Sequence, residues 1–409
     1  MRDNPERLAW TIMILAFVTF CVLVTGIPLG IRAYILNATQ PEPSSVTSVQ
    51  GTVLVQRLDA SIPLPVSDGT TIQVEENTNI RTDGTAQATV TFFNDSLLTL
   101  YNNTSVTIHQ ARSPRFTSGQ QPDTILVELH YGRVRVVPMS KTMNDHPRAL
   151  HFEVRCRDAH AVLSEGSYAL EASDDEVQIT TRVGVARITS GEEQLVLAAG
   201  ERAILPRNQP PLGPVPAERN LLVNGDFSQP LEGSWQVYRI EPPSGVITTT
   251  AQIISTGVQK VLHLQSSGQD NLHSEIGVIQ QINKNIQDFE SLRILLDVRV
   301  NLQSLPGGGT LGSEFPLMVH LAYDEMDGTD RDWYCGFYYA SAPADWILHD
   351  TPFNSSRRVV RYVWYPFESP NLLDSLSTAK PVYLKFIRLY GSGWLYDAYV
   401  TNVTLLAQE

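Results

Sequence analysis

The chain has 409 residues, with 30 Lys and Arg against 43 Asp and Glu, and carries a net charge of −13 at neutral pH. An acidic protein is repelled by phosphate backbones, so composition excludes nucleic acid as an expected partner. Three cysteines are too few for a disulfide scaffold. The elements that the sequence predicts follow in chain order.

Residues 8–31 form a run without a charged side chain. A helix of this length covers roughly 36 Å, which exceeds a hydrocarbon core of about 30 Å. A cleaved secretory signal is the alternative, but its apolar stretch is about 7 to 15 residues and ends in a small-x-small site. Residues 32–37 offer no such site. The run therefore predicts an uncleaved, single transmembrane helix.

The orientation of that helix is predicted from the flanking cations. Arg2 and Arg7 precede the run, whereas Arg32 is the single cation after it until Arg57. Positive charge favours the cytoplasmic side of a membrane. We expect residues 1–7 to be a short cytoplasmic tail in a cell-membrane protein whose bulk is extracytoplasmic.

Two polar, proline-bearing segments divide the rest of the chain. The second contains five prolines within eleven residues and predicts a semi-rigid extended spacer at about 3.1 Å per residue. The pieces on either side are each large enough for a core of their own. The expected parts are a juxtamembrane spacer (32–46), a first domain (47–205), a proline-rich linker (206–219) and a second domain (220–409).

The first domain alternates apolar and polar residues with period two, as in Val90 and Phe92 or in Val134 and Val136. This alternation is typical of strands with one face in a core. Asp-Gly and Ser-Gly pairs break the runs every dozen residues or so, as turns do. The predicted fold class is mainly β, with one N-terminal transmembrane helix followed by two all-β domains.

The first domain also contains an ordered series of short motifs. They are VQGTV (49–53), DGTTI (68–72), IRTDG (80–84), LTL (98–100), NT (103–104), YG (131–132), FEV (152–154), EGSY (165–168), GVA (184–186) and GE (200–201). This series resembles the FecR-type domain, and the resemblance implies stacked β-hairpins outside the membrane, known from regulators that relay a surface signal to a sigma factor. About seven residues precede the span, too few to hold a folded partner as an anti-sigma segment does. A sensor, scaffold or interaction module is therefore expected.

The second domain opens with Asn224-Gly225-Asp226-Phe227, reaches Trp235 after a short loop and closes with the segment WLYDAYV (394–400). These ends resemble the jelly-roll superfamily of carbohydrate-binding modules and galactose-binding-like domains. The resemblance implies a β-sandwich. It also implies a structural calcium ion between the first and last strands, which would involve Asp226 and Asp397 and is the single candidate cofactor.

Every tryptophan outside the apolar run lies in the second domain. Aromatic faces stack on the C–H bonds of a sugar ring, although large aromatic residues in sandwiches are more often core. The predicted ligand-binding residues are Trp333, Tyr334, Trp346, Trp364 and Tyr365.

Residues 324–332 place five acids in nine positions, without the alternate spacing of an EF-hand loop, and predict an acidic hairpin turn. Catalytic signatures such as H-E-x-x-H, G-x-S-x-G and the phosphate-binding loop are missing from the sequence. The first hypothesis is thus a membrane-anchored binding protein, not an enzyme, whose partner is a cell-surface glycan or an envelope protein. A signalling regulator that acts through a separate membrane partner is the second hypothesis, and an extracellular glycan-active enzyme is the third.

Overall fold

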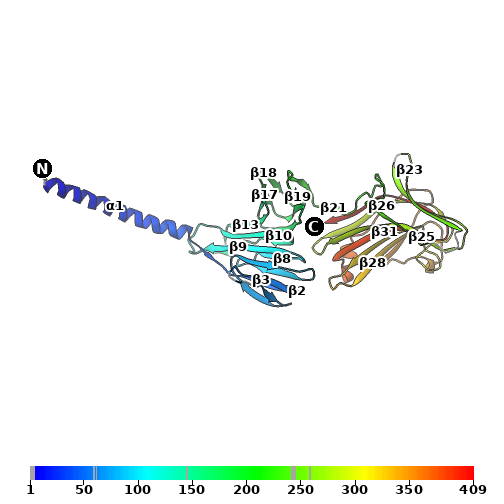
Figure 1. Ribbon diagram of the computed structural model, residues 1–409, viewed down its shortest axis with the longest axis horizontal. Helices are drawn as coiled ribbons and strands as arrows, with labels where there is room; N and C mark the ends of the chain where they lie inside the picture. Colours follow the sequence, from blue (N-terminus) through cyan, green and yellow to red (C-terminus); the bar gives the residue numbers. More distant parts are fainter. Residues whose placement is uncertain (1–4, 59, 61, 144–145, 241–245, 258) are drawn as a thin grey trace. The chain divides into compact units, whose positions relative to one another are not determined.

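The computed structural model describes residues 5–58, 60, 62–143, 146–240, 246–257 and 259–409. The chain divides into two units, Met1–Ala217, which contains one N-terminal helix and a β-built body, and Glu218–Glu409, which is mainly β (Figure 1). The prediction of a mainly β chain is confirmed. Residues 1–4 of the predicted cytoplasmic tail lie outside the described residues.

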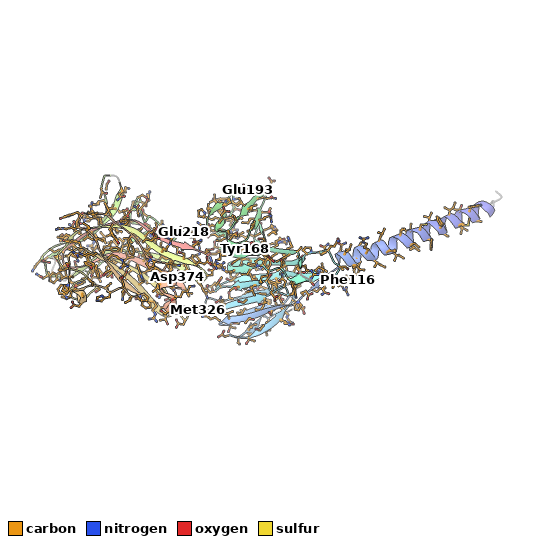
Figure 2. All side chains as sticks on the ribbon, turned by 180° about the vertical axis from the view of Figure 1, so that it is seen from behind. Phe116, Tyr168, Glu193, Glu218, Met326 and Asp374 are labelled. Atoms are coloured by element: carbon orange, nitrogen blue, oxygen red, sulfur yellow. The ribbon has the colours of Figure 1, made fainter. Side chains whose placement is uncertain are left out.

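Helix α1 (Pro5–Asn37) has 33 residues and is long and apolar enough over Ala9–Asn37 to cross a membrane. A signal sequence would meet the same criteria. The apolar window of α1 is not buried against protein, and its side chains project into open space along most of its length (Figure 2). Thr19 and Thr25 donate their hydroxyls to carbonyls four residues earlier, so these polar groups need no external partner.

The first β unit is built from two sheets that share one strand. Sheet 1 has the order β18-β17-β14-β13-β10-β9-β6-β3-β4, with β1 on the end of β9, and sheet 2 has the order β5-β2-β7-β8-β10-β15-β16-β19-β20. The strands are β1 (Thr39–Pro41), β2 (Ser44–Gln50), β3 (Val53–Gln56), β4 (Leu64–Val66), β5 (Thr71–Val74), β6 (Thr78–Arg81), β7 (Gln87–Thr91), β8 (Leu97–Leu100), β9 (Ser105–Pro114), β10 (Asp123–Val137), β13 (Leu150–Cys156), β14 (Ala159–Leu163), β15 (Ser167–Ala172), β16 (Glu176–Val183), β17 (Ala186–Ser190), β18 (Glu193–Leu197), β19 (Glu201–Pro206) and β20 (Leu212–Pro216), with a separate pair β11 (Thr142–Met143) and β12 (His146–Pro147).

Strand β10 passes from one sheet to the other at Gly132. Its first part pairs with β9 and β13, and its second part pairs with β8 and β15. Gly132 has φ +92°, and a Cβ there would collide with the backbone of Asn103 and Thr104. Only glycine fits this bend without strain. The alternating residues along β10, such as Val127, Val134 and Val136, fill the core between the sheets.

The outer surface of sheet 1 carries a cluster of polar side chains centred on Glu153. Its carboxylate accepts hydrogen bonds from Arg155 at 2.8 Å, His160 at 3.0 Å and His151 at 3.2 Å. Burial by itself would raise the pKa of Glu153, but the hydrogen bonds from His160, Arg155 and His151 outweigh it and lower the pKa to about 2.

This shift predicts an acid-sensitive contribution to the stability of the first unit. The pKa of Glu153 is lower in the folded state than the ordinary value of about 4.3, so its contribution is complete above that value and is lost as the pH falls toward 2. We expect Glu153→Gln to remove about 2 kcal/mol at neutral pH and to flatten the unfolding free energy between pH 4.5 and pH 2. Denaturant titrations across that range measure it. The exposed turn variant Glu193→Gln is the control, and equal slopes for both variants would contradict the prediction.

The proline-rich segment differs from the extended spacer that the sequence predicts. β20 folds back and pairs antiparallel with β19, with Glu201 opposite Pro216 and Arg202 opposite Val215. A strand at the edge of a sheet tolerates proline because its outer N–H groups need no partner. The predicted juxtamembrane spacer is also structured, since α1 continues to Asn37 and β1 and β2 begin within it.

The second unit is a sandwich of two mainly antiparallel sheets. Sheet 3 has the order β23-β24-β32-β26-β30, with β21 beside β32, and sheet 4 has the order β22-β25-β31-β27-β28-β29. The elements are β21 (Arg219–Asn220), β22 (Gln236–Ile240), β23 (Ile247–Ser255), β24 (Lys260–Gly268), β25 (Ser274–Asn285), β26 (Ser291–Gln303), β27 (Leu317–Asp324), β28 (Asp330–Tyr338), η1 (Ala344–Trp346), β29 (Asn354–Arg358), β30 (Tyr365–Glu368), α2 (Leu372–Ser375), η2 (Ser377–Ala379), β31 (Tyr383–Gly393) and β32 (Tyr396–Gln408).

The opening motif of this unit closes the sandwich at one edge. The Asn224 side chain donates to the Gln229 carbonyl at 2.9 Å, and the Asn224 carbonyl accepts from the Trp235 indole N–H at 3.1 Å. Phe227 and Trp235 pack together in the core. Gly225 lies directly on the backbone of Val403, in the last strand. The motif therefore has a structural role, because it holds the start of the unit against its last strand.

Candidate functional site

The outer side of sheet 4 carries several aromatic side chains together with charged ones. Strand register places Tyr238, Gly277 and Tyr390 in one row across β22, β25 and β31. The next row places Arg388 opposite His320, and His320 opposite Tyr334. The aromatic face, as we call this surface, consists of Tyr238, Glu275, His320, Asp332, Tyr334, Arg388 and Tyr390.

Arg388 is the centre of this face. Its Nε donates to His320 Nδ1 at 2.9 Å, and its guanidinium lies 5.3 Å from the ring centre of Tyr238 and 4.9 Å from that of Tyr390. A carboxylate oxygen of Glu275 is 3.9 Å from its Nη1. The two rings hold the guanidinium plane by cation–π attraction, which fixes the direction of its remaining donors.

The protonation state of His320 follows from its partners. Because Arg388 can only donate, His320 Nδ1 must accept, so the ring proton is on Nε2, which donates to Asp332 at 2.6 Å. Burial lowers the pKa of His320, and the charge of Arg388 adds to this, against the opposing hydrogen bond to Asp332. His320 is therefore neutral at physiological pH, with both ring nitrogens engaged.

The tyrosines supply flat surfaces and hydroxyl donors. Tyr334 stacks on His320 at 4.4 Å between ring centres, with 18° between the planes. Burial raises the pKa of Tyr238, Tyr334 and Tyr390, and in Tyr238 the negative charge of Glu275 adds to it. These phenols therefore remain protonated; the Tyr238 hydroxyl and Tyr390 are buried, and the half-buried Tyr334 is the accessible ring.

Access to the face differs along its length. At one end Leu348 packs against Phe315, Met318 and Tyr390. Toward the other end the side chain of Asp332 is 49 % exposed, and Tyr334 is half-buried. This open part combines a stacking ring, a carboxylate acceptor and the edge of the Arg388 group, which are the groups that bind a sugar ring.

The predicted ligand-binding residues of β28 lie on opposite sides of sheet 4. Tyr334 is on the aromatic face, whereas Trp333 is 3 % exposed and belongs to the core between the sheets. Consecutive residues of a strand point to opposite sides. A buried indole leaves no surface for a ligand, so Trp333 stabilises the sandwich.

The other predicted aromatic residues lie elsewhere in the unit. Trp346 is half-buried in η1. Trp364 lies under the Arg299 guanidinium at 5.2 Å, on the outer side of sheet 3, and Tyr365 in β30 packs against the core. The structure therefore does not bring Trp364 and Tyr365 together with Tyr334.

The two carboxylates considered for calcium are held by separate partners. Asp226 is exposed and accepts from the Ser228 N–H at 3.2 Å, and Asp397 accepts from His263 Nε2 at 2.8 Å. Within the described ranges, no group of three or more His, Cys, Asp and Glu side chains is arranged to hold a metal. Calcium takes six to eight oxygen ligands, and the described surroundings of Asp226 and Asp397 do not fit such a set.

The acidic segment at 324–332 is the hairpin between β27 and β28. Lys385 lies 2.8 Å from Asp324 and also contacts Asp330, and Arg331 pairs with Glu325. Asp327 accepts from the Thr329 N–H at 2.9 Å. Lys385 and Arg331 thus offset part of the negative charge of the turn.

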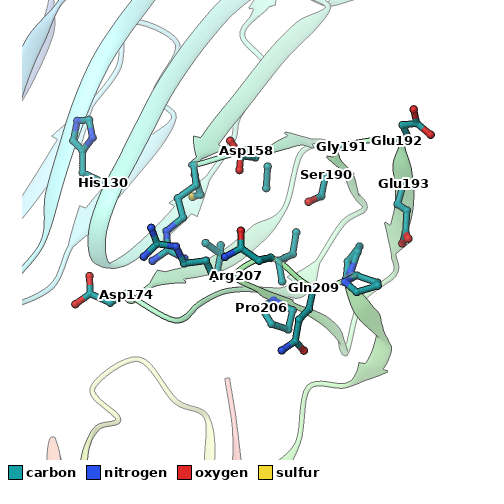
Figure 3. A pocket seen from close by; sticks show the side chains of 18 residues that line it. His130, Asp158, Asp174, Ser190, Gly191, Glu192, Glu193, Pro206, Arg207 and Gln209 are labelled. Atoms are coloured by element: carbon teal, nitrogen blue, oxygen red, sulfur yellow. The ribbon is translucent and has the colours of Figure 1, made fainter.

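A cavity of about 890 Å³ opens between hairpin turns of the first unit. Figure 3 shows His130 and Asp174 on one side of it, and Glu192 and Glu193 on the other. Two arginines and four carboxylates line it, so its lining is net negative. The Cys156 thiol at its base is buried, which raises its pKa to about 12 and makes it a poor nucleophile.

No family model and no curated protein matches the chain. Among solved structures, one described as an anti-sigma factor from Parabacteroides distasonis is 22 % identical, with 33 % of this chain and 57 % of that chain covered and a TM-score of 0.26. A family 11 carbohydrate-binding module from a Clostridium thermocellum cellulase is 16 % identical, with 46 % and 93 % covered and a TM-score of 0.26. A β-1,2-glucanase from Parabacteroides distasonis is 16 % identical, with 42 % and 22 % covered and a TM-score of 0.24. The chain spans little more than half of the anti-sigma structure. At such scores these similarities add no argument to the geometry.

Proposed function

We propose that the protein is a membrane-anchored receptor that binds uncharged glycans on the aromatic face, without catalysis. The observation that carries the proposal is the Arg388 guanidinium, which lies over the neighbouring rings of Tyr238 and Tyr390, next to the stacked pair His320 and Tyr334. Such fixed planar groups cost little ordering entropy on binding.

The charge of the face supports the choice of an uncharged glycan. Asp332 and Glu275 are negative and Arg388 is positive, while His320 is neutral. Sugar hydroxyls can donate to the carboxylates and accept from the guanidinium and phenols. Polyanionic glycans would be repelled by the net charge of −13 of the whole chain.

Retention of α1 as an anchor is supported by contacts of its last turn. The Tyr34 ring meets that of Phe116 edge-on at 5.9 Å, and Gln121 donates to Asn37 at 2.8 Å. Removal of a signal peptide near this turn would expose the end of the first β unit. The apolar length of α1 then places the anchor in a bilayer.

Binding to a neutral glycan array by the full chain in lipid nanodiscs tests the glycan proposal. Tyr334→Ala should weaken a hit about tenfold, because one stacked ring contributes about 1 to 1.5 kcal/mol. Trp364→Ala, on the opposite sheet, is the matched control and should leave affinity unchanged. Equal loss in both variants, or failure of every neutral glycan to bind, contradicts the proposal. Release of products from a bound glycan would instead indicate an enzyme.

A further inference from the structure

The end of α1 is joined to the first β unit by the loop between β9 and β10, residues 115–122. Arg115 Nη1 donates to the Tyr34 hydroxyl at 3.1 Å, and the Arg115 N–H donates to the Ala38 carbonyl at 2.9 Å. The Gln120 N–H donates to the Leu36 carbonyl at 3.0 Å, which satisfies a free carbonyl at the helix end. The loop is therefore fixed against the helix.

Glycine keeps this loop close to the strand that precedes it. A Cβ on Gly119 would lie 2.7 Å from the Pro114 side chain and 3.8 Å from the Ile35 carbonyl. Strand β1 adds a second connection, because Thr39 pairs with Pro114. Loop and helix end thus form one structured junction. Figure 2 shows Phe116 at the end of the unit where α1 joins it.

The height of the junction above a bilayer follows from helix geometry. The uncharged run ends at Ile31, and Asn37 is six residues later, or about 9 Å along the axis. Tyr34 is about 4.5 Å beyond the run by the same rise. The polar headgroup layer is about 5 to 7 Å thick on each side of the hydrocarbon core. Arg115 and Phe116, which contact Tyr34, therefore lie at headgroup level.

The composition of the junction matches that layer. Residues 32–38 and 115–122 contain Arg32 and Arg115 and no acidic residue, in a chain with 13 more acids than bases. Arg115 is exposed, and Tyr34 is 55 % exposed beside the half-buried Phe116. Aromatic rings are enriched at membrane interfaces, and arginines there bind lipid phosphates.

We infer that the β9–β10 loop is a second membrane contact, with Phe116 at the level of the lipid glycerol and with Arg32 and Arg115 on headgroup phosphates. This contact rests on the proposed membrane anchor. It holds the first β unit against the bilayer surface, so that α1 and the unit do not swing independently.

The test is a depth measurement on the full chain in nanodiscs. Ser118→Cys provides a label in the loop, and Glu192→Cys labels the β17–β18 turn, at the far end of the strands. Strands β10 and β13 are parallel, and both run away from the helix. Ala159 pairs with Cys156 at the end of β13 and also with Ser190, so the turn after Ser190 lies at the far end of these strands. The native Cys156 and Cys335 are buried with pKa values raised to about 12 and about 11, so they react slowly.

Lipids with a nitroxide on the headgroup should quench a fluorophore at position 118 strongly and one at position 192 weakly. Adding anionic phosphatidylglycerol should increase the quenching at 118. The double change Arg115→Glu with Phe116→Ser should reduce it to the level at position 192, whereas Arg187→Glu, an exposed charge reversal away from the loop, should leave it unchanged.

Two failures are distinguishable. If the chain resists carbonate extraction but both labels are quenched equally, the anchor stands and the loop contact is overturned. Recovery of the chain in the carbonate-soluble fraction would overturn the anchor and the loop contact together.

Discussion

Replacing Arg388 with alanine is expected to weaken glycan binding about 100-fold and to lower the unfolding free energy of the second unit by about 2 kcal/mol. A hydrogen bond to a charged group contributes about 1.5 to 3 kcal/mol, and loss of the guanidinium leaves Glu275 and His320 Nδ1 without this partner. The neighbouring rings of Tyr238 and Tyr390 also lose the guanidinium that lies over them. Calorimetric titration measures the binding, and denaturant unfolding measures the stability.

Arg299→Ala is the matched control for this change. Arg299 also lies over two rings, Tyr399 at 4.5 Å and Trp364 at 5.2 Å, but on the outer side of sheet 3. We expect a similar loss of stability with unchanged glycan affinity. If Arg388→Ala unfolded more easily but bound glycan normally, the aromatic face would not be the binding site.

Gly225→Ala is expected to destabilise the second unit by about 3 kcal/mol. Its Cβ would collide with the backbone carbonyl of Val403 in β32, whose own N–H donates to the Gly225 carbonyl at 2.9 Å, so that relief of the collision would break this contact. The loss should be confined to the second unit, because the first has a separate core. Hydrogen exchange resolved by peptide measures each unit in the same sample.

Gly84→Ala serves as the comparison, because its nearest neighbour would be the Asn103 side chain at 3.6 Å, an ordinary contact distance. We expect a change below about 1 kcal/mol there. If Gly225→Ala were equally mild, the opening motif would not lock the ends of the sandwich together.

Local patterns predict strands well in this chain, because alternation depends on near neighbours alone. Val90 and Phe92 or Val134 and Val136 are buried as expected. Arg133 and Arg135, which alternate with Val134 and Val136, are less exposed than alternation suggests. Arg133 pairs with Glu171 at 3.0 Å and Arg135 donates to Ser167 at 3.1 Å, contacts that depend on a neighbouring strand.

The aromatic face is harder to predict because its residues come from strands far apart in the sequence. Tyr238, His320 and Arg388 belong to β22, β27 and β31, and only sheet order brings them together. His320 between Val319 and Leu321, and Arg388 between Ile387 and Leu389, each interrupt an apolar run, and this is the signal that the sequence offers. The sequence prediction includes both Trp333 and Tyr334, since an isolated strand does not reveal which side faces the core.

The structure of the proline-rich segment is hard to predict for a similar reason, because it also depends on strand pairing. Prolines favour extended backbone both in a free spacer and in an edge strand, so composition does not separate the two. Pairing of β20 with β19 decides the matter, and it needs residues that precede the prolines.

The shared strand β10 also sets the order in which the first unit can be completed during synthesis. The N-terminal strands emerge from the ribosome first, yet β8 and β9 both require β10 as their neighbour. Neither sheet can therefore close until Val137 is available, and β13 and β15 can join only afterwards. Such non-local pairing folds slowly and leaves strand edges open to aggregation. The nascent protein consequently has its greatest need of chaperone protection while residues 39–137 are being made.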